Sequence, residues 1–204
     1  MKEQKKIAVW TGIICVIAFF VAVVANCNGY SFVSNIFIGI FSSSLLACLI
    51  SMISYFVERK KTIALLYNGC LDFNESLNLN LSREGIIDIK EAKANLMVMK
   101  SVYQKDVFPH ASQLISILNK STLKGIVSDI DKYAENLYRA ICADIDAIDE
   151  FYMGNIAQEE MVHYKWKYLT SDSINSLKLL YESLDSLARN QFKNSIKEAK
   201  SDAD

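Results

Sequence analysis

The sequence has almost no proline, little glycine and, over a long N-terminal stretch, no charge. Its 204 residues include one proline and seven glycines, and no alternating strand pattern is present, which argues against a β fold. No Asp, Glu, Lys or Arg occurs between Ile7 and Val57. The five cysteines are scattered without a CxxC spacing, so neither a zinc site nor a disulfide framework is indicated. Phosphate-loop, nucleophile-elbow and metalloprotease motifs are absent, and we expect no enzyme, cofactor or metal.

The uncharged stretch is long enough for two membrane spans. Residues 7–25 would extend about 28 Å as a helix, which matches a hydrocarbon core of about 30 Å. Residues 32–57 would extend about 39 Å, so this span is expected to tilt or to continue into the cytosol. The link of residues 26–31 is short, uncharged and turn-prone. The pattern predicts a transmembrane hairpin.

Basic residues flank this hairpin on one side only. They precede the first span and follow the second, and the link has none: Lys2, Lys5, Lys6, Arg59, Lys60 and Lys61. The positive-inside rule therefore places both termini in the cytoplasm, in a bacterial inner membrane. The last three of these residues are expected to contact lipid headgroups or to ring the cytosolic mouth of an oligomer. A cleaved signal peptide is the rival interpretation, but the apolar run is long for one and a second span follows.

Residues 58–204 carry 19 basic and 22 acidic residues and show helical periodicity. We expect an all-α protein, with a transmembrane hairpin in residues 1–57 and a cytosolic helical bundle in residues 58–204. The first of its helices is predicted to continue the second span to about Asn78, before a loop to Gly85. The second runs from about Asp88 to Lys120 with a bend or break near Pro109. The third starts after Thr122 and runs to about Tyr168 with a possible interruption at Gly154, and the fourth starts after Asp172 and ends near Lys200.

Two of these helices carry apolar stripes that predict packing faces. The stripe of the third helix is Ile141, Ile145, Ile148 and Tyr152. The stripe of the fourth is Ile174, Leu177, Tyr181, Leu184 and Ala188, widened by Leu180 and Leu187. The acidic residues Asp144, Asp146, Asp149 and Glu150 are predicted to lie on the solvated face opposite the isoleucines. Glu160 and His163 supply only half of a di-iron motif, so they do not predict a metal site.

Small and polar side chains recur about every fourth residue in the second span. We call them the small-residue row: Asn35, Gly39, Ser43, Ala47, Ser51 and Ser54. Small residues let membrane helices approach closely, and the first span offers a facing surface of Gly12, Cys15, Ala18 and Ala22. Polar groups within a membrane also line water-filled cavities. Because a four-residue repeat drifts by about 40° per step, part of the row is expected to pack and part to line a pore.

Aromatic and basic residues alternate in the segment from His163 to Tyr168. Its members are His163, Tyr164, Lys165, Trp166, Lys167 and Tyr168. Aromatic rings stack on bases and lysines neutralise phosphates, so the segment predicts a contact for a nucleotide or a short single strand, with Arg139 or Lys132 nearby. The alternative is a structural corner in which the rings anchor a helix end.

The chain resembles two-span effectors of bacterial anti-phage operons in its layout. The shared features are a hairpin over residues 7–57, a basic cluster after it at Arg59, Lys60 and Lys61, and a helical cytosolic region. Such effectors include SLATT-type membrane proteins and the channel subunit of the Hailong system. The abundance of apolar stripes predicts a homo-oligomer, taken as a tetramer, that assembles through the spans and the cytosolic helices. The resemblance implies that it conducts ions and depolarises the host membrane. It also implies gating by a nucleotide or oligonucleotide made by a partner nucleotidyltransferase. The alternative is a non-conducting membrane scaffold or sensor that recruits a cytosolic partner.

Overall fold

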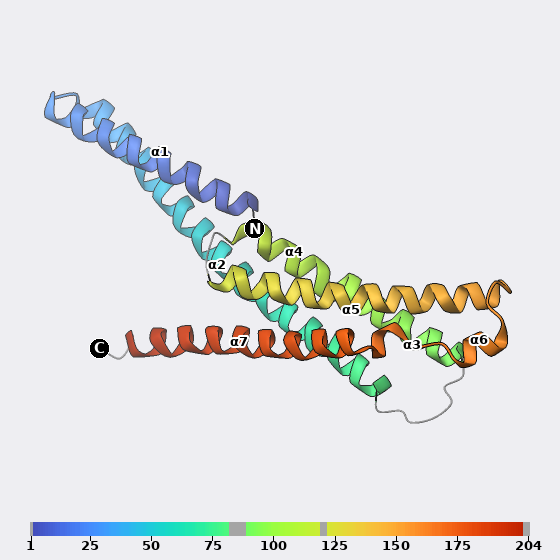
Figure 1. Cartoon of the computed structure of the whole chain (residues 1–204). Helices are drawn as coiled ribbons and strands as arrows, with labels where there is room; N and C mark the ends of the chain where they lie inside the picture. Colours follow the sequence, from blue (N-terminus) through green and yellow to red (C-terminus); the bar gives the residue numbers. More distant parts are fainter. Residues whose placement is uncertain (1, 82–88, 119–121, 202–204) are drawn as a thin grey trace. The chain divides into compact units, whose positions relative to one another are not determined.

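The computed structural model describes residues 2–81, 89–118 and 122–201, which form helices and contain no strand (Figure 1). The predicted all-α class is confirmed. The elements are α1 (Lys2–Cys27), α2 (Ser31–Leu81), α3 (Ile89–Val102), the π-helix η1 (Tyr103–Val107), α4 (Phe108–Ile117), α5 (Thr122–Tyr152), α6 (Gln158–Val162), the 3-10 helix η2 (Lys167–Leu169) and α7 (Ser171–Ser201). The chain forms two compact units, residues 1–62 and 63–204, and α2 contributes residues to both.

In the first unit, α1 and α2 are both long and apolar enough to cross a membrane. They contact each other through small side chains. The hydroxyl of Ser34 donates a hydrogen bond of 3.1 Å to the carbonyl of Ala22, and the Sγ atom of Cys48 lies 3.5 Å from the carbonyl oxygen of Ala8. Gly29, with a φ of 78°, allows the sharp turn between the helices. Small side chains thus permit the close approach of the two backbones.

The buried side chains of α1 are Cys15, Ala18, Ala22 and Ala25, spaced three or four residues apart. Three of the four residues predicted to face the second span are among them, and Gly12 is half-buried. The spacing keeps the small residues on one stripe of the helix, as in other helix-packing seams.

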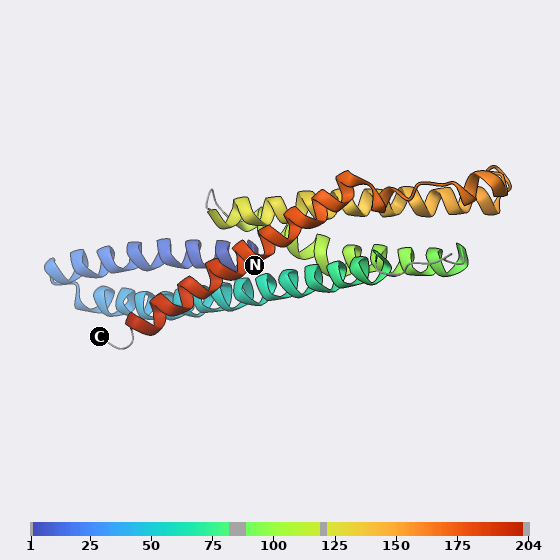
Figure 2. The ribbon, with the colours of Figure 1, turned by 60° about the horizontal axis from the view of Figure 1, so that its bottom comes forward.

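In the second unit, α3, α4 and α7 pack against α5, and Figures 1 and 2 show α7 beside α5. The buried stripe of α5 runs along most of its length: Leu123, Val127, Ile130, Ala134, Leu137, Ile141, Asp144, Ile145 and Ile148. The end of α2 adds a stripe of its own: Ile63, Leu66, Cys70, Phe73 and Leu77. Both stripes follow the three-and-four spacing of an amphipathic helix.

The predicted bend near Pro109 is confirmed as the π-helix η1 directly before it. The amide of Phe108 donates to the carbonyl of Tyr103, five residues earlier. Proline has no amide hydrogen and its ring clashes with the carbonyl four residues before it, so a wider turn relieves the conflict. This turn also brings the backbone of Asp106 against Gly69 of α2.

Two predicted helix boundaries are wrong. α2 continues to Leu81, so the loop predicted from Asn78 does not begin there, and residues 82–85 lie outside the described residues. α5 ends at Tyr152 and not at Tyr168, and the predicted possible interruption at Gly154 is confirmed, because a φ of 79° at this glycine terminates the helix. The following residues form α6 and η2, which are separate short elements.

The predicted stripe of α7 is only partly correct. Leu177, Leu180, Leu184 and Leu187 are buried, whereas Ile174 is 50% exposed and Tyr181 is 42% exposed. Ser173 and Ser176 take their places at the buried face. The face with Ile174 and Tyr181 and the face with the four leucines both follow the helical period, and the face with the leucines packs on α5. Tyr152 is likewise exposed, unlike the isoleucines of its predicted stripe.

We predict that Gly69→Ala destabilises the protein by about 1–3 kcal/mol, because overpacking forces the backbone to shift. A Cβ atom at Gly69 would lie 2.6 Å from the carbonyl oxygen of Asp106. Gly125→Ala in α5 is the matched control, since its Cβ meets nothing within 4 Å, and it is expected to be neutral or slightly stabilising. Denaturant unfolding in detergent, followed by helical circular dichroism, measures both. Equal stability of the two variants would contradict the close approach.

Candidate functional site

The small-residue row turns away from α1 toward the start of α2. Asn35, Gly39 and Ser43 are exposed, whereas Ala47, Ser51 and Ser54 are half-buried. The hydrogen bonds between α1 and α2 involve instead every seventh position of α2, at Ser34, Phe41 and Cys48. A step of seven residues drifts by only about 20°, so the two lines diverge toward the start of α2. The first half of the row therefore lies on a surface of α2 that α1 leaves exposed.

The hydroxyl and the glycine in the exposed half of the row do not require a contact with α1. The hydroxyl of Ser43 donates to the carbonyl of Gly39 over 2.9 Å, and that of Ser42 donates to Ile38 over 2.9 Å. A Cβ at Gly39 would meet nothing within 4 Å. Packing of α2 on α1 therefore does not require glycine at position 39. Either a second copy or solvent is free to approach this surface.

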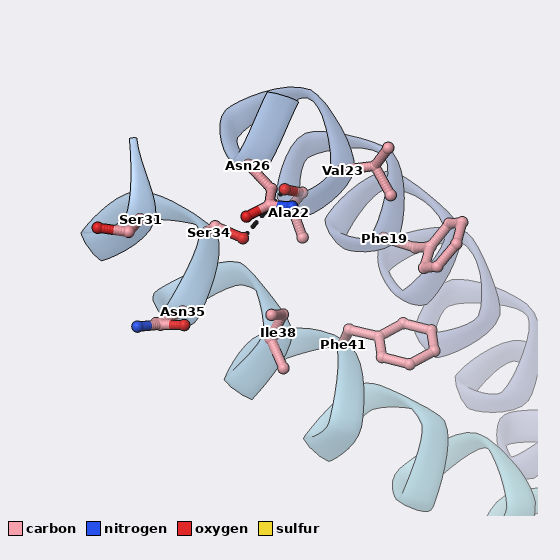
Figure 3. A pocket seen from close by; sticks show the side chains of 9 residues that line it. All are labelled: Phe19, Ala22, Val23, Asn26, Ser31, Ser34, Asn35, Ile38 and Phe41. Carbon is pink, nitrogen blue, oxygen red and sulfur yellow. Dashed lines mark hydrogen bonds between the residues drawn. The ribbon is translucent and has the colours of Figure 1, made fainter. Parts of the chain in front are cut away.

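A cleft of about 350 Å³ opens between α1 and α2 near the turn (Figure 3). Its polar lining comes from Asn26, Ser31, Ser34 and Asn35. Its apolar lining comes from Phe19, Ala22, Val23, Ile38 and Phe41, and the rings of Phe19 and Phe41 lie 5.5 Å apart between centroids. Figure 3 shows Asn35 extending away from the hydrogen bond of Ser34 to Ala22. The polar and apolar residues thus occupy successive parts of one cleft.

In the second unit, the segment from His163 to Tyr168 is held by one buried carboxylate. Asp144 of α5 is fully buried and accepts three hydrogen bonds. The Oδ1 atom accepts from the Tyr164 hydroxyl over 3.0 Å and from the Lys167 amide over 2.7 Å. The Oδ2 atom accepts from the Tyr168 amide over 2.9 Å. The prediction that Asp144 lies on a solvated face is therefore wrong.

Burial and hydrogen bonding act in opposite directions on this site. Burial raises the pKa of the Asp144 carboxyl above its ordinary value, and the hydrogen bonds from the backbone of Lys167 and Tyr168 and from Tyr164 offset part of the rise. Burial, together with the charge of Asp144, raises the pKa of Tyr164 to about 12. The tyrosine therefore keeps its proton and remains a donor to Asp144 at neutral pH.

Side chains of the segment alternate between the interior and solvent. Tyr168 is buried and Tyr164 and Trp166 are half-buried, and the ring of Trp166 lies 5.4 Å from that of Tyr164 and 6.3 Å from that of Tyr168. The odd-numbered residues His163, Lys165 and Lys167 are exposed, and we call the two lysines the cationic edge. The rings are occupied with one another, as expected of a structural corner. The charges remain accessible to an anionic ligand.

The contacts of Arg139 and Lys132 are with residues of α5 itself. Arg139 pairs with Glu135 over 2.6 Å, and the Lys132 ammonium lies 5.7 Å from the ring centroid of Tyr133. At about 100° per residue, these two cations stand roughly 120–140° around α5 from Asp144, which binds the segment. Their proximity to the segment stays a prediction.

The remaining acidic and basic candidates lie elsewhere. Asp149 pairs with Lys93, and Glu150 accepts a hydrogen bond from the Asn155 amide over 2.5 Å. Among the described residues, no three His, Cys, Asp or Glu side chains are grouped to hold a metal ion. In α2, Arg59 is half-buried, whereas Lys60 and Lys61 are exposed.

Asp144 is the functional residue that the sequence interpretation misplaced, although a signal was present. It lies three residues after Ile141 and four before Ile148, so it falls within the buried stripe. A lone acid in such a stripe needs hydrogen-bond donors from another element.

Comparisons of the chain with protein-family models, with curated proteins and with solved structures find no match. The functional argument therefore rests on the residues themselves.

We predict that Tyr164→Phe lowers the free energy of unfolding by about 1–3 kcal/mol, because it removes a hydrogen bond to a buried charged group. It should also raise the pKa of Asp144 further. The folded pKa already exceeds the unfolded one, so the stability contributed by Asp144 is present at low pH and is lost as pH rises through the folded pKa. The variant shifts this loss to higher pH.

Denaturant unfolding over a pH series, with ¹³C NMR of labelled aspartate, measures both effects of Tyr164→Phe. Tyr152→Phe is the matched control, because Tyr152 is exposed and its ring contact with Lys93 survives the change. An unmoved Asp144 pKa, or equal losses of stability in the two variants, would show that the Tyr164 hydroxyl does not hold the segment.

Proposed function

We propose that residues 1–62 insert into the bacterial inner membrane as a helical hairpin with both ends in the cytoplasm. The supporting observation is that small side chains lie between the two helices and large apolar ones lie outside, the reverse of a water-soluble protein. Small residues fill the seam between α1 and α2, whereas large apolar side chains such as Trp10 (65% exposed) and Leu46 (60% exposed) face outward. A water-soluble protein rarely exposes such continuous apolar surface, but a lipid-facing surface requires it. Tyr30 and Tyr55 stand near the two ends of the apolar part of α2, where interfacial aromatics are common.

We further propose that several copies assemble into an ion-conducting pore, with Asn35, Gly39 and Ser43 facing its axis. The observation that carries this proposal is the departure of these residues from the seam with α1. Two helices cannot enclose a pore, so a polar surface left exposed within the membrane needs further copies. A tetramer is the assembly we propose, with Arg59, Lys60 and Lys61 near the cytosolic mouth. Opening of the pore would depolarise the membrane, as the resemblance to anti-phage effectors implies.

The proposed gate is a phosphate-bearing ligand at the cationic edge. Residues 58–204 are net acidic, so phosphate binding requires a local concentration of positive charge. Lys165 and Lys167 provide that charge in exposed positions, while Asp144 fixes the backbone that carries them. The ligand class is a nucleotide or a short single-stranded nucleic acid made by a partner nucleotidyltransferase.

A non-conducting scaffold or sensor is the second candidate function, and one observation favours it. The hydroxyls of Ser42 and Ser43 already donate to carbonyls of their own helix. A surface with satisfied donors packs against a second copy without any need for water. In that case the membrane unit serves as an anchor for a cytosolic partner.

We predict that Ser43→Leu abolishes conductance while leaving assembly intact, because the added bulk narrows and dries the proposed axis. Ser42→Leu is the matched control: it is the same change one residue away, about 100° around the helix, and it should conduct normally. Single-channel recording of the purified protein with its ligand measures the effect, and particle mass in detergent monitors assembly. Silent bilayers with the parent protein under activating conditions would favour the scaffold instead.

We predict that replacing Lys165 and Lys167 with Glu weakens binding of an oligonucleotide probe more than tenfold, a loss of about 1.4 kcal/mol or more. The slope of log affinity against log salt should fall by about 0.7 for each lost phosphate contact. Replacing Lys132 and Arg139 with Glu makes the same charge change within α5, on a face turned away from Asp144, and should leave oligonucleotide binding unchanged. If both double variants bind equally, the cationic edge is not the ligand site.

A further inference from the structure

The cleft between α1 and α2 is polar at one end and apolar at the other, as a phospholipid is. Its polar residues lie near the turn, where Asn26 and Ser31 flank the link between the helices. Its apolar residues Phe19 and Phe41 lie roughly 10–15 Å further along the helices, at 1.5 Å per residue. In an inserted hairpin, the first region falls at headgroup depth and the second within the hydrocarbon. A ligand that matches the cleft is therefore polar at one end and apolar at the other.

We propose that this cleft binds one phospholipid of the outer leaflet, with an uncharged or zwitterionic headgroup. No charged side chain lines the cleft, and the link between the helices has no Lys or Arg. An anionic headgroup would lack the cation that normally attracts it. Amide and hydroxyl groups of Asn26, Ser31 and Asn35 instead suit the phosphate ester and ammonium of a zwitterionic lipid, because they both donate and accept hydrogen bonds. The apolar walls of the cleft take the upper part of an acyl chain.

A second cleft in the same unit provides a comparison. It also measures about 350 Å³ and lies on the other side of α1, where Phe20, Val24 and Tyr30 line it. Its lining is almost entirely apolar, since Asn28 directs its amide to the carbonyl of Val24. Both clefts admit acyl chains by size alone. Only the first one offers several polar groups to a headgroup, so headgroup selectivity distinguishes specific binding from general lipid coating.

The inference depends on the proposed membrane insertion and is independent of the pore. Asn35 belongs both to the cleft and to the small-residue row, so the bound lipid would lie beside the outer end of that row. A headgroup that contacts Asn35 gives its amide hydrogen-bond partners at the outer end of the row. The lipid would thus support the row in a scaffold as well as in a pore.

The test uses the full chain, delipidated in mild detergent and titrated with phosphatidylethanolamine or phosphatidylglycerol. Native mass spectrometry counts the bound lipids. Val23→Trp fills the first cleft and Val24→Trp fills the second. We expect Val23→Trp to weaken phosphatidylethanolamine binding about tenfold, equivalent to about 1.4 kcal/mol, and Val24→Trp to leave it unchanged. Asn35→Leu, a surface change that does not alter the seam, should weaken it about threefold to tenfold, with Ser42→Leu as its control.

Three results would overturn the inference. The first is equal lipid binding by the two Trp variants, and the second is phosphatidylglycerol binding as tight as that of phosphatidylethanolamine. The third is a Val23→Trp variant that changes the particle mass but not the lipid binding, which would mean that a second copy occupies the cleft. Conductance recorded from the same preparations separates this failure from failure of the pore. Extraction of the parent protein from membranes by alkaline carbonate would instead contradict insertion, and with it both proposals.

Discussion

The buried carboxylate of Asp144 determines the path of the chain between α6 and α7. A charged group without water must be compensated by hydrogen bonds, and here all three donors come from the segment that follows α6. Two of them are consecutive backbone amides, so the carboxylate fixes the backbone direction as well as its position. Tyr168 is held inward within η2, and Lys165 and Lys167 remain exposed. The exposed side chain of Lys167 thus stands on a backbone amide that the buried carboxylate holds.

A different constraint governs the first unit, where side-chain size replaces polarity as the organising property. In the proposed membrane insertion, apolar side chains gain nothing from burial against one another, so close backbone approach and hydroxyl bonds would select the seam. Cys15, Ala18 and Ala22 allow that approach, and Ser34 supplies the hydroxyl bond. Because α1 covers a single stripe of α2, any small residue outside that stripe requires another explanation. Gly39 is the clearest example, since no neighbour in the chain approaches it.

The sequence was sufficient to predict the helical class, the two apolar helices and the bend before Pro109, because charge distribution and proline chemistry act locally. It was not sufficient for the choice between two helical faces of α7, where Ile174 and Leu177 satisfied the same period and tertiary contact with α5 decided. The end of α5 was predicted only as a possible interruption, because a glycine ends a helix only when its backbone adopts a positive φ, as Gly154 does. Asp144 was misplaced because nearby acids suggested a solvated surface, although its register with Ile141 and Ile148 indicated burial.

The arrangement of the segment from His163 to Tyr168 limits how a ligand there can act. With the rings packed together, binding energy comes from charge more than from stacking, which implies strong salt dependence and little preference among bases. A ligand shifts a conformational equilibrium only if it binds one state better than another. Lys167 links the proposed ligand to the fold, because its side chain is exposed while its own amide is held by Asp144. Under that proposal, a phosphate bound at Lys167 would favour the arrangement of the segment that the hydrogen bonds of Asp144 stabilise.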